Sequence, residues 1–107
     1  MKKTTESDLV HSALVWLNLV WPDGVWWRAN CGSTNMAGAG QRKRFVRFGV
    51  PGMSDIQGVN VGRAYFIECK TAKGKQTPLQ IAFQAVVEHA GAVYLLVRSI
   101  EDLEKAL

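Results

Sequence analysis

Asp55 and Glu68 are the two residues of this sequence whose types and spacing most strongly indicate chemistry. Residues 60–63 between them have the composition of a turn. If the turn is centred between Val61 and Gly62, Asp55 faces Glu68 across an antiparallel hairpin, and directly opposed side chains lie roughly 4.5–5.5 Å apart. Two carboxylates this close repel each other unless a cation lies between them, and Mg²⁺ prefers such hard oxygen ligands. The spacing therefore predicts a Mg²⁺ site.

Lys70 shares this face, because it follows Glu68 by two positions on the same strand. A lysine placed there can balance the negative charge that develops at a phosphate during hydrolysis. Tyr65, Ile67 and Cys69 alternate with these residues, so we expect them to point into the core. A shift of one residue in the pairing would instead turn one carboxylate to the opposite face.

A simpler interpretation is that Lys70 forms a surface salt bridge with Glu68 or Asp55, since such triplets are common on exposed strands. Two features favour the metal site. The apolar pair Phe66-Ile67 directly before Glu68 disfavours an exposed strand, and the two acids are the only ones in a strongly basic stretch.

Glu6 and Gln80 are candidates for supporting positions in the same site. Glu6 falls on the inward face of the first expected helix, four positions before Val10, which would let it reach the metal. The alternative is that an acid in the first helical turn only interacts favourably with the helix dipole. Gln80 also has an alternative role, as the partner of Thr77 in a capping box.

The middle of the chain is strongly basic. Between Arg28 and Lys75, nine Lys or Arg residues accompany only the two acids, whereas the whole chain has a net charge of +4. Such a stretch suits a polyanion such as nucleic acid, although an ordinary solvated surface also carries charge. The candidate DNA-binding residues are Arg28, Arg42, Lys43, Arg44, Arg47, Lys73 and Lys75.

The order of expected helices and strands predicts an α/β fold, a mixed β-sheet flanked by helices. We expect helices over residues 5–21, 77–89 and 101–107. We expect strands over residues 25–29, 44–48, 55–59, 64–70 and 92–97, the last an apolar run typical of a central buried strand. Residues 30–40 are rich in Gly, Ser, Asn and Ala and predict a loop. The four Trp residues are expected to serve the core or a subunit interface.

Size and composition fit one domain, residues 1–107, because the chain has 107 residues and 48% of them are apolar. No apolar run approaches the ~18 residues of a membrane span, and the polar N-terminus lacks the pattern of an export signal. Cys31 and Cys69 lack the Cys-x-x-Cys spacing of a zinc site, and so few cysteines suit free thiols inside a cell. We therefore expect a cytoplasmic protein with no membrane partner.

Three segments together resemble one nuclease family. They are Gly52-Met53-Ser54-Asp55, Phe66-Ile67-Glu68-Cys69-Lys70 and Thr77-Pro78-Leu79-Gln80. In this order they resemble the VRR-NUC branch of the PD-(D/E)XK nuclease superfamily, in its stand-alone phage or bacterial form. Residues 28–32, residues 47–52 and the early Glu6 are similar to that branch too, so the likeness covers nearly the whole chain. Met53 stands where the superfamily's name would place an acid, which this branch does not require.

The resemblance implies a fold and a role for each site residue. The fold would be a PD-(D/E)XK nuclease-like core. Asp55, Glu68 and the backbone carbonyl of Cys69 would bind Mg²⁺, with Mn²⁺ as a substitute. Lys70 would stabilise charge or orient water, and Glu6 and Gln80 would have supporting roles. Such chains resemble homodimeric junction-resolving nucleases of bacterial or phage-infected cells.

The function we expect is metal-dependent hydrolysis of DNA by a homodimeric endonuclease that acts on branched DNA such as Holliday junctions. One rival hypothesis is a nucleic-acid-binding module that keeps the fold but does not cut. The intact set of Asp55, Glu68 and Lys70 argues against it, because a binder gains nothing from buried acids that face phosphates. Another rival is a subunit of a phage assembly with a nuclease-like fold, which would bind its partner regardless of metal.

Overall fold

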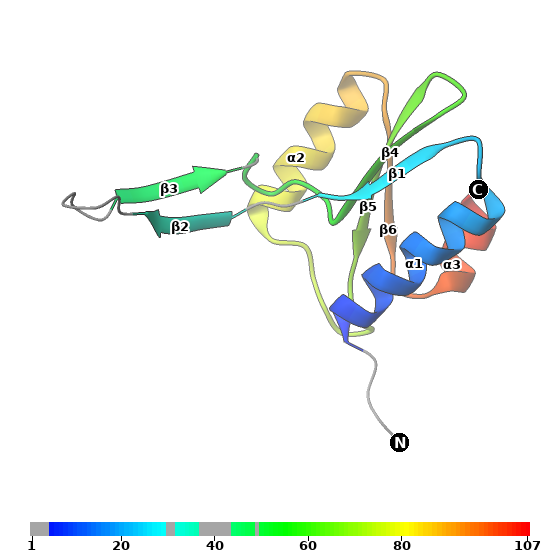
Figure 1. The fold of residues 1–107 in the computed structure, drawn as a ribbon, viewed down its shortest axis with the longest axis horizontal. Coiled ribbons are helices and arrows are strands. Elements are labelled where there is room, and N and C mark those ends of the chain that lie inside the picture. Colours follow the sequence, from blue (N-terminus) through cyan, green and yellow to red (C-terminus); the bar gives the residue numbers. More distant parts are fainter. Residues whose placement is uncertain (1–4, 30–31, 37–43, 49) are drawn as a thin grey trace.

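Four strands of the chain form a mixed sheet with helices on both faces, and two further strands form a separate ribbon (Figure 1). The computed structural model describes residues 5–29, 32–36, 44–48 and 50–107, and it describes residues 32–36 and 44–48 by their backbone. The mixed sheet and its flanking helices confirm the predicted α/β class. No helix in these ranges is long and apolar enough to cross a membrane.

The strands of the sheet lie in the order β1-β4-β5-β6. β1 (Val25–Arg28), β4 (Ile56–Asn60) and β5 (Arg63–Cys69) are antiparallel neighbours, whereas β6 (Val93–Val97) runs parallel to β5. The prediction that β6 occupies a central position was wrong, because it forms one edge of this sheet. Its run of apolar residues has another cause: α2 and α3 both pack against this strand.

The β4–β5 hairpin has the predicted register. Asn60 pairs with Arg63, and Ile56 pairs with Ile67 four steps farther from the turn. Asn60 and Arg63 therefore belong to the strands, and the turn itself consists of Val61 and Gly62. Both turn residues have positive φ, 50° and 74°, as a two-residue turn that follows the twist of the strands requires. This conformation suits glycine and is unusual for a β-branched residue such as Val61.

Helices α1 (Glu6–Val20) and α3 (Ile100–Ala106) cover one face of the sheet and contribute the main core. Thr5 caps α1 in a reciprocal capping box with Asp8. The buried core residues are Leu9, Val10, Ala13, Leu17, Trp26, Ile56, Ile67, Cys69, Val97 and Leu103. Ile67 and Cys69 thus point into the core as predicted, and Tyr65 packs against it.

Helix α2 (Pro78–His89) lies on the opposite face of the sheet. Its Phe83 meets Phe66 of β5 and Tyr94 of β6 in edge-to-face contacts, with ring centroids 5.4 and 6.5 Å apart. Alternate residues of β5 therefore face different layers. Phe66, Glu68 and Lys70 belong to the face opposite to Ile67 and Cys69.

Three of the four Trp residues serve the core. Trp26 is buried, its ring packs against Tyr65, and its indole N–H donates to the carbonyl oxygen of Trp21 over 3.1 Å. Trp16 and Trp21 are partly buried against the core, whereas Trp27 is 43% exposed.

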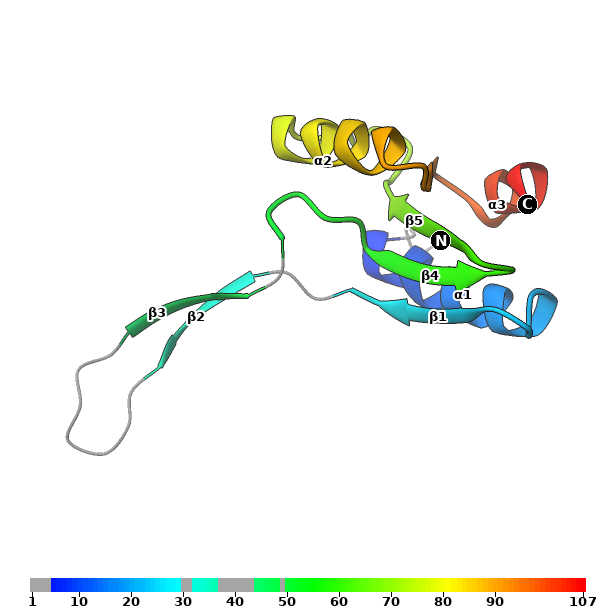
Figure 2. The same cartoon turned by 90° about the horizontal axis from the view of Figure 1, so that it is seen from above.

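The ribbon consists of β2 (Gly32–Met36) and β3 (Arg44–Phe48), which pair antiparallel and extend away from the sheet (Figure 2). The prediction of a loop over residues 30–40 was therefore wrong for residues 32–36, while residues 30, 31 and 37–40 lie outside the described ranges. The polar sequence of β2 has no apolar alternation to indicate a strand. Its pairing with β3 instead satisfies the backbone N–H and C=O groups.

Candidate active site

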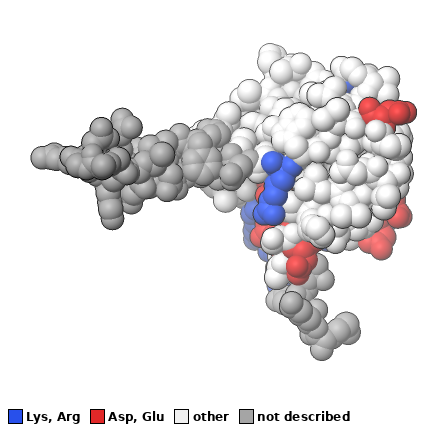
Figure 3. All heavy atoms as spheres, viewed as in Figure 1, with Lys and Arg blue, Asp and Glu red and all other residues white. Residues whose placement is uncertain are grey.

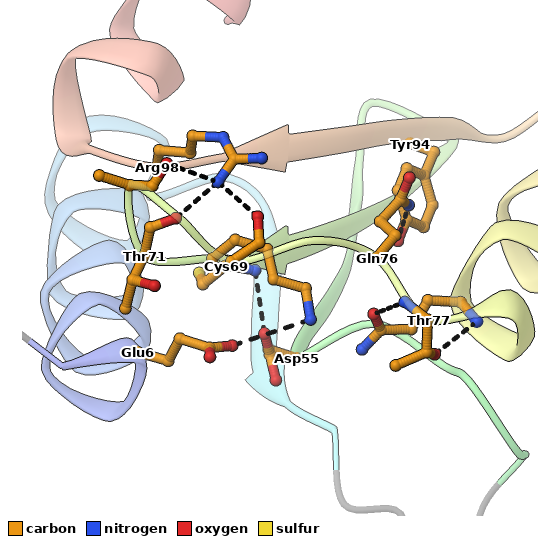
Figure 4. Close-up of polar contacts among 12 residues, drawn as sticks. Glu6, Asp55, Cys69, Thr71, Gln76, Thr77, Tyr94 and Arg98 are labelled. Atoms are coloured by element: carbon orange, nitrogen blue, oxygen red, sulfur yellow. Dashed lines mark hydrogen bonds and ion pairs between the residues drawn. The ribbon is translucent and has the colours of Figure 1, made fainter.

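Asp55 is fixed at the open end of the β4–β5 hairpin, one residue before β4. Its backbone carbonyl accepts a hydrogen bond from the N–H of Ala29 (2.8 Å), which extends the pairing with β1. Its Oδ2 accepts a hydrogen bond from the backbone N–H of Cys69 over 2.9 Å. Figure 4 shows this side chain between Glu6, which projects from α1, and Thr77, at the start of α2. The hairpin register thus brings Asp55 to the end of β5, where Glu68 lies.

Glu68 is a buried acid, with 2% of its surface exposed, and its Oε2 has no hydrogen-bond partner among the described residues. Loss of water, the hydrogen bond with the side chain of Asp55 and the charge of Asp55 raise the pKa of Glu68 to about 8, whereas Lys70 acts in the opposite direction. Asp55 and Glu68 therefore interact directly, and without a cation their carboxyl groups are most stable with a proton on Glu68.

Lys70 follows β5, and its backbone N–H donates to the carbonyl oxygen of Val97 over 3.0 Å. Only 8% of its side chain is exposed, and its Nζ lies 4.0 Å from Oε1 of Glu6. No ion pair within this distance joins Lys70 to Asp55 or Glu68, all of which the structure describes. The simple salt bridge within the hairpin is therefore not formed, and the partner of Lys70 comes from α1.

Glu6 lies in the first turn of α1, and 49% of its side chain is exposed. It is an acid at a helix N-terminus, and it also faces the site, so the two interpretations of this residue are compatible. Its charge contributes to the raised pKa of Glu68. The structure therefore brings Glu6, Asp55, Glu68 and Lys70 together at one end of the sheet.

Gln80 forms the capping box that its spacing from Thr77 predicted. Its Oε1 accepts the backbone N–H of Thr77 over 2.9 Å, and its own backbone N–H donates to Oγ1 of Thr77 over 3.2 Å. The capping interpretation is confirmed, and a supporting role in the active site stays a prediction. The loop before Asp55 touches this helix at Gly52, whose φ is +79° and where a Cβ would collide with the carbonyl group of Leu79.

A polar cluster next to the site was not anticipated from the sequence. The amide Nε2 of Gln76 donates to Oε1 of Gln84 over 3.0 Å and to the hydroxyl of Tyr94 over 3.3 Å (Figure 4). Burial raises the pKa of Tyr94 to about 12, and the charges of Glu68 and Asp55 also raise it. No spacing pattern links residues 76, 84 and 94, so only their tertiary contact identifies this cluster.

The predicted DNA-binding residues lie in several elements. Arg28 is exposed at the end of β1 and is paired with Ile56, the residue after Asp55, while Lys73 and Lys75 are exposed on the loop that follows Lys70. Most of the body surface seen in Figure 3 belongs to uncharged residues, and most of the Lys and Arg atoms visible on it form one group. Arg44 and Arg47 are on β3, and Arg42 and Lys43 lie outside the described residues.

The donor groups at this site fit a hard divalent cation. The described residues contain no group of three or more His, Cys, Asp or Glu arranged to hold a metal ion. Mg²⁺ does not require one, because it commonly binds one or two carboxylates together with water and phosphate oxygens. Asp55 and the unpartnered Oε2 of Glu68 are two such donors.

In comparisons with known proteins, no family model matches this chain, and no curated protein matches it well enough to indicate a relationship.

Proposed function

We propose that the chain is a metal-dependent DNA endonuclease with a PD-(D/E)XK nuclease-like core of the VRR-NUC type. The observation that carries the proposal is the contact between the side chains of Asp55 and Glu68, where a buried oxygen of Glu68 has no partner in the part of the chain that the structure describes. A buried carboxyl oxygen that accepts no hydrogen bond costs stability. Its place beside a second acid and a shielded lysine is explained if the group binds a cation during function.

The chemistry divides between the cation and the residues around it. Bound Mg²⁺ supplies a Lewis acid that polarises a phosphate and lowers the pKa of a water molecule. Asp55, Glu68 and the backbone carbonyl of Cys69 are the groups that would hold it. The N–H of Cys69 keeps the carboxylate of Asp55 in its orientation, which reduces the reorganisation needed during the reaction.

Lys70 supplies a positive charge for the phosphate that undergoes attack. Its ammonium group lies next to Glu6 and the carboxyl pair, and little of its side chain is exposed to water. Electrostatic stabilisation of developing charge is strongest where water is excluded. Oε1 of Glu6 lies 4.0 Å from this ammonium group and so helps to hold it at the site.

Nucleic acid is the phosphodiester substrate that the charge distribution supports. Arg28, Lys73 and Lys75 are exposed close to the candidate site, and cationic side chains bind DNA phosphates without regard to sequence. The β2–β3 ribbon, which carries Arg44 and Arg47, extends away from the sheet (Figure 2). A two-stranded ribbon has dimensions that the major groove of DNA accepts.

The experiment is a cleavage assay on linear, flapped and four-way-junction DNA with Mg²⁺, with Mn²⁺ and with EDTA. We expect cleavage with either metal and none in EDTA. Asp55→Asn keeps the size of the side chain and removes a metal ligand, so it should abolish cleavage. Asp23→Asn, in the exposed turn after α1, is the matched control and should cut like the parent.

Two results would contradict the proposal. Undiminished cutting in EDTA would exclude the metal mechanism. DNA binding without cleavage of any substrate, with either metal, would favour the non-catalytic binding module, and absence of both binding and cleavage would favour an assembly subunit.

A further inference from the structure

The loop between β5 and α2 is held by a residue that directly follows β6, the strand next to β5 in the sheet. Arg98 follows β6, and its Nη1 donates to the carbonyl oxygens of Thr71 (2.5 Å), Gly74 (2.8 Å) and Ala72 (3.4 Å). Figure 4 shows the guanidinium group directed at the segment that contains Thr71. The N–H of Gly74 also donates to the carbonyl of Thr71 over 3.1 Å. One guanidinium nitrogen therefore donates hydrogen bonds to three backbone carbonyls of the same tight turn.

This turn lies against the side chain of Lys70. A methyl group placed on Gly74 would lie 3.4 Å from Cδ of Lys70 and 3.2 Å from Oγ1 of Thr71. The turn at Gly74 thus lies beside the aliphatic part of Lys70, and only 8% of this side chain is exposed. A Cβ at this position would be tight only against Oγ1 of Thr71, whereas its distance to Lys70 would be an ordinary van der Waals contact.

The two ends of the lysine are fixed by different groups. The backbone N–H of Lys70 is bonded to the carbonyl of Val97, the residue directly before Arg98. The ammonium group meets Glu6 at 4.0 Å. Between these two points the flexible four-carbon stem can adopt several rotamers, and the turn at Gly74 lies beside this stem. The conformation of this loop is held by Arg98. Without its guanidinium group, the carbonyls of the exposed turn would bond to water instead.

We propose that Arg98 is a positioning residue of the candidate active site, which keeps the turn of residues 71–74 closed over Lys70 and so directs its ammonium group toward Glu6 and the carboxyl pair. The catalytic consequence rests on the proposed nuclease function, whereas the shielding of Lys70 does not. A purely structural Arg98 would stabilise the fold without any effect on the environment of Lys70.

Three variants separate these two roles. Arg98→Met keeps an unbranched side chain and removes every donor. Arg98→Lys places three N–H donors on one nitrogen, which suits carbonyls that converge on a single atom, so it should restore part of the effect. Arg63→Met makes the same replacement at an exposed arginine beside the hairpin turn, at the other end of β5, and is the control.

The first measurement is the rate at which an acetylating reagent modifies Lys70 in the folded protein, followed by peptide mass spectrometry and normalised to the exposed Lys105. We expect a several-fold higher rate in Arg98→Met, an intermediate rate in Arg98→Lys and an unchanged rate in Arg63→Met. An unchanged rate in a folded Arg98→Met protein would overturn the proposal. If Arg98→Met does not fold, the test uses Arg98→Lys. An acetylation rate of Lys70 equal to that of the parent, together with reduced thermal stability of Arg98→Lys, would then overturn the proposal.

The second measurement is steady-state cleavage of DNA. Arg98→Met should lower kcat with little change in KM, and Arg98→Lys should recover part of kcat. Equal kcat in Arg98→Met and the parent, with Lys70 exposed, would overturn the positioning role. If the parent itself does not cut DNA, the proposed nuclease function fails, and the acetylation result still decides whether Arg98 shields Lys70.

Discussion

Asp55 and Cys69 are joined by a hydrogen bond from the backbone N–H of Cys69 to Oδ2 of Asp55, 2.9 Å long, beyond the last paired residues of the hairpin. The bond comes from the backbone, so it survives any change of side chain at Cys69. It uses one oxygen of the carboxylate. A metal ligand that is oriented by its own scaffold before the cation arrives loses little freedom on binding.

Replacement of Lys70 by alanine should lower cleavage roughly 100-fold or more, the usual cost of losing one group that stabilises developing charge. Binding of Mn²⁺ or Mg²⁺, measured by calorimetry, should largely survive because both carboxylates remain. Lys105→Ala, which removes an exposed charge from α3, is the control. Activity of Lys70→Ala near that of the parent would reduce Lys70 to the role of an ion-pair partner for Glu6.

The stability of the metal-free protein should fall as the pH rises. The pKa of Glu68 is raised from 4.5 to about 8 in the folded protein. The contribution of this group to the free energy of unfolding is therefore fully present below pH 4.5. It is lost progressively up to about pH 8, because the unfolded chain releases this proton first. Each unit of pKa difference corresponds to about 1.4 kcal/mol.

Thermal unfolding in EDTA, followed by circular dichroism from pH 4.5 to 9, measures this effect. Other groups titrate too, so the relevant quantity is the difference between the parent and Glu68→Gln. We expect the variant to gain stability relative to the parent with increasing pH. Added Mg²⁺ should stabilise the parent most at high pH and leave Glu68→Gln nearly unaffected. Parallel curves for the two proteins would contradict the assignment of the raised pKa.

Neutralising Arg42, Lys43 and Arg44 together should weaken DNA binding and reduce its salt dependence. Each phosphate contact contributes roughly 0.9 to the slope of log K against log salt concentration. Fluorescence anisotropy with a labelled duplex at several salt concentrations measures the slope. Lys105→Ala serves again as the control. An unchanged slope in the triple variant would mean that these residues face away from DNA.

A homodimer that cuts branched DNA is the expected assembly. Large apolar side chains are exposed on both α1 and α2, among them Leu19 (75%), Leu79 (59%) and Val86 (67%), and self-association would bury part of such surface. Sedimentation at micromolar concentration should give about twice the mass of one chain. Four-way junctions should be cut at two symmetry-related points, in preference to linear duplex. A monomer with equal activity on both substrates would leave a simple nicking nuclease as the better interpretation.

The hairpin could be predicted from the sequence because its information is local. A two-residue turn and the alternation of apolar residues fix which residues face each other, and Asn60 opposite Arg63 follows from the turn alone. The capping box of Thr77 and Gln80 is similarly local. The sequence did not show whether β6 is an edge strand or a central strand of the sheet. A strand covered by helices on both faces has a continuous apolar run in either position.

The groups that surround Lys70 could not be predicted, because they meet it only through tertiary structure. Arg98 acts on backbone carbonyls, which every residue has, so no pattern of side chains marks its partners. The ion pair with Glu6 depends on how α1 crosses the sheet. Strand β2 was missed because its polar composition gives no signal until its partner β3 is known.

The contacts around Lys70 come from segments near both ends of the chain. Glu6 lies in the first helix, and Val97 and Arg98 lie at the end of the last strand, yet both groups meet the short segment after β5. A ribosome-bound fragment that ends before β6 would contain both acids and Lys70, but it would lack the strand that anchors the lysine. Contacts between segments so distant in sequence carry a large loop-closure cost and slow folding. If the site cuts DNA as proposed, a nascent chain would be inactive until translation of this domain is nearly complete.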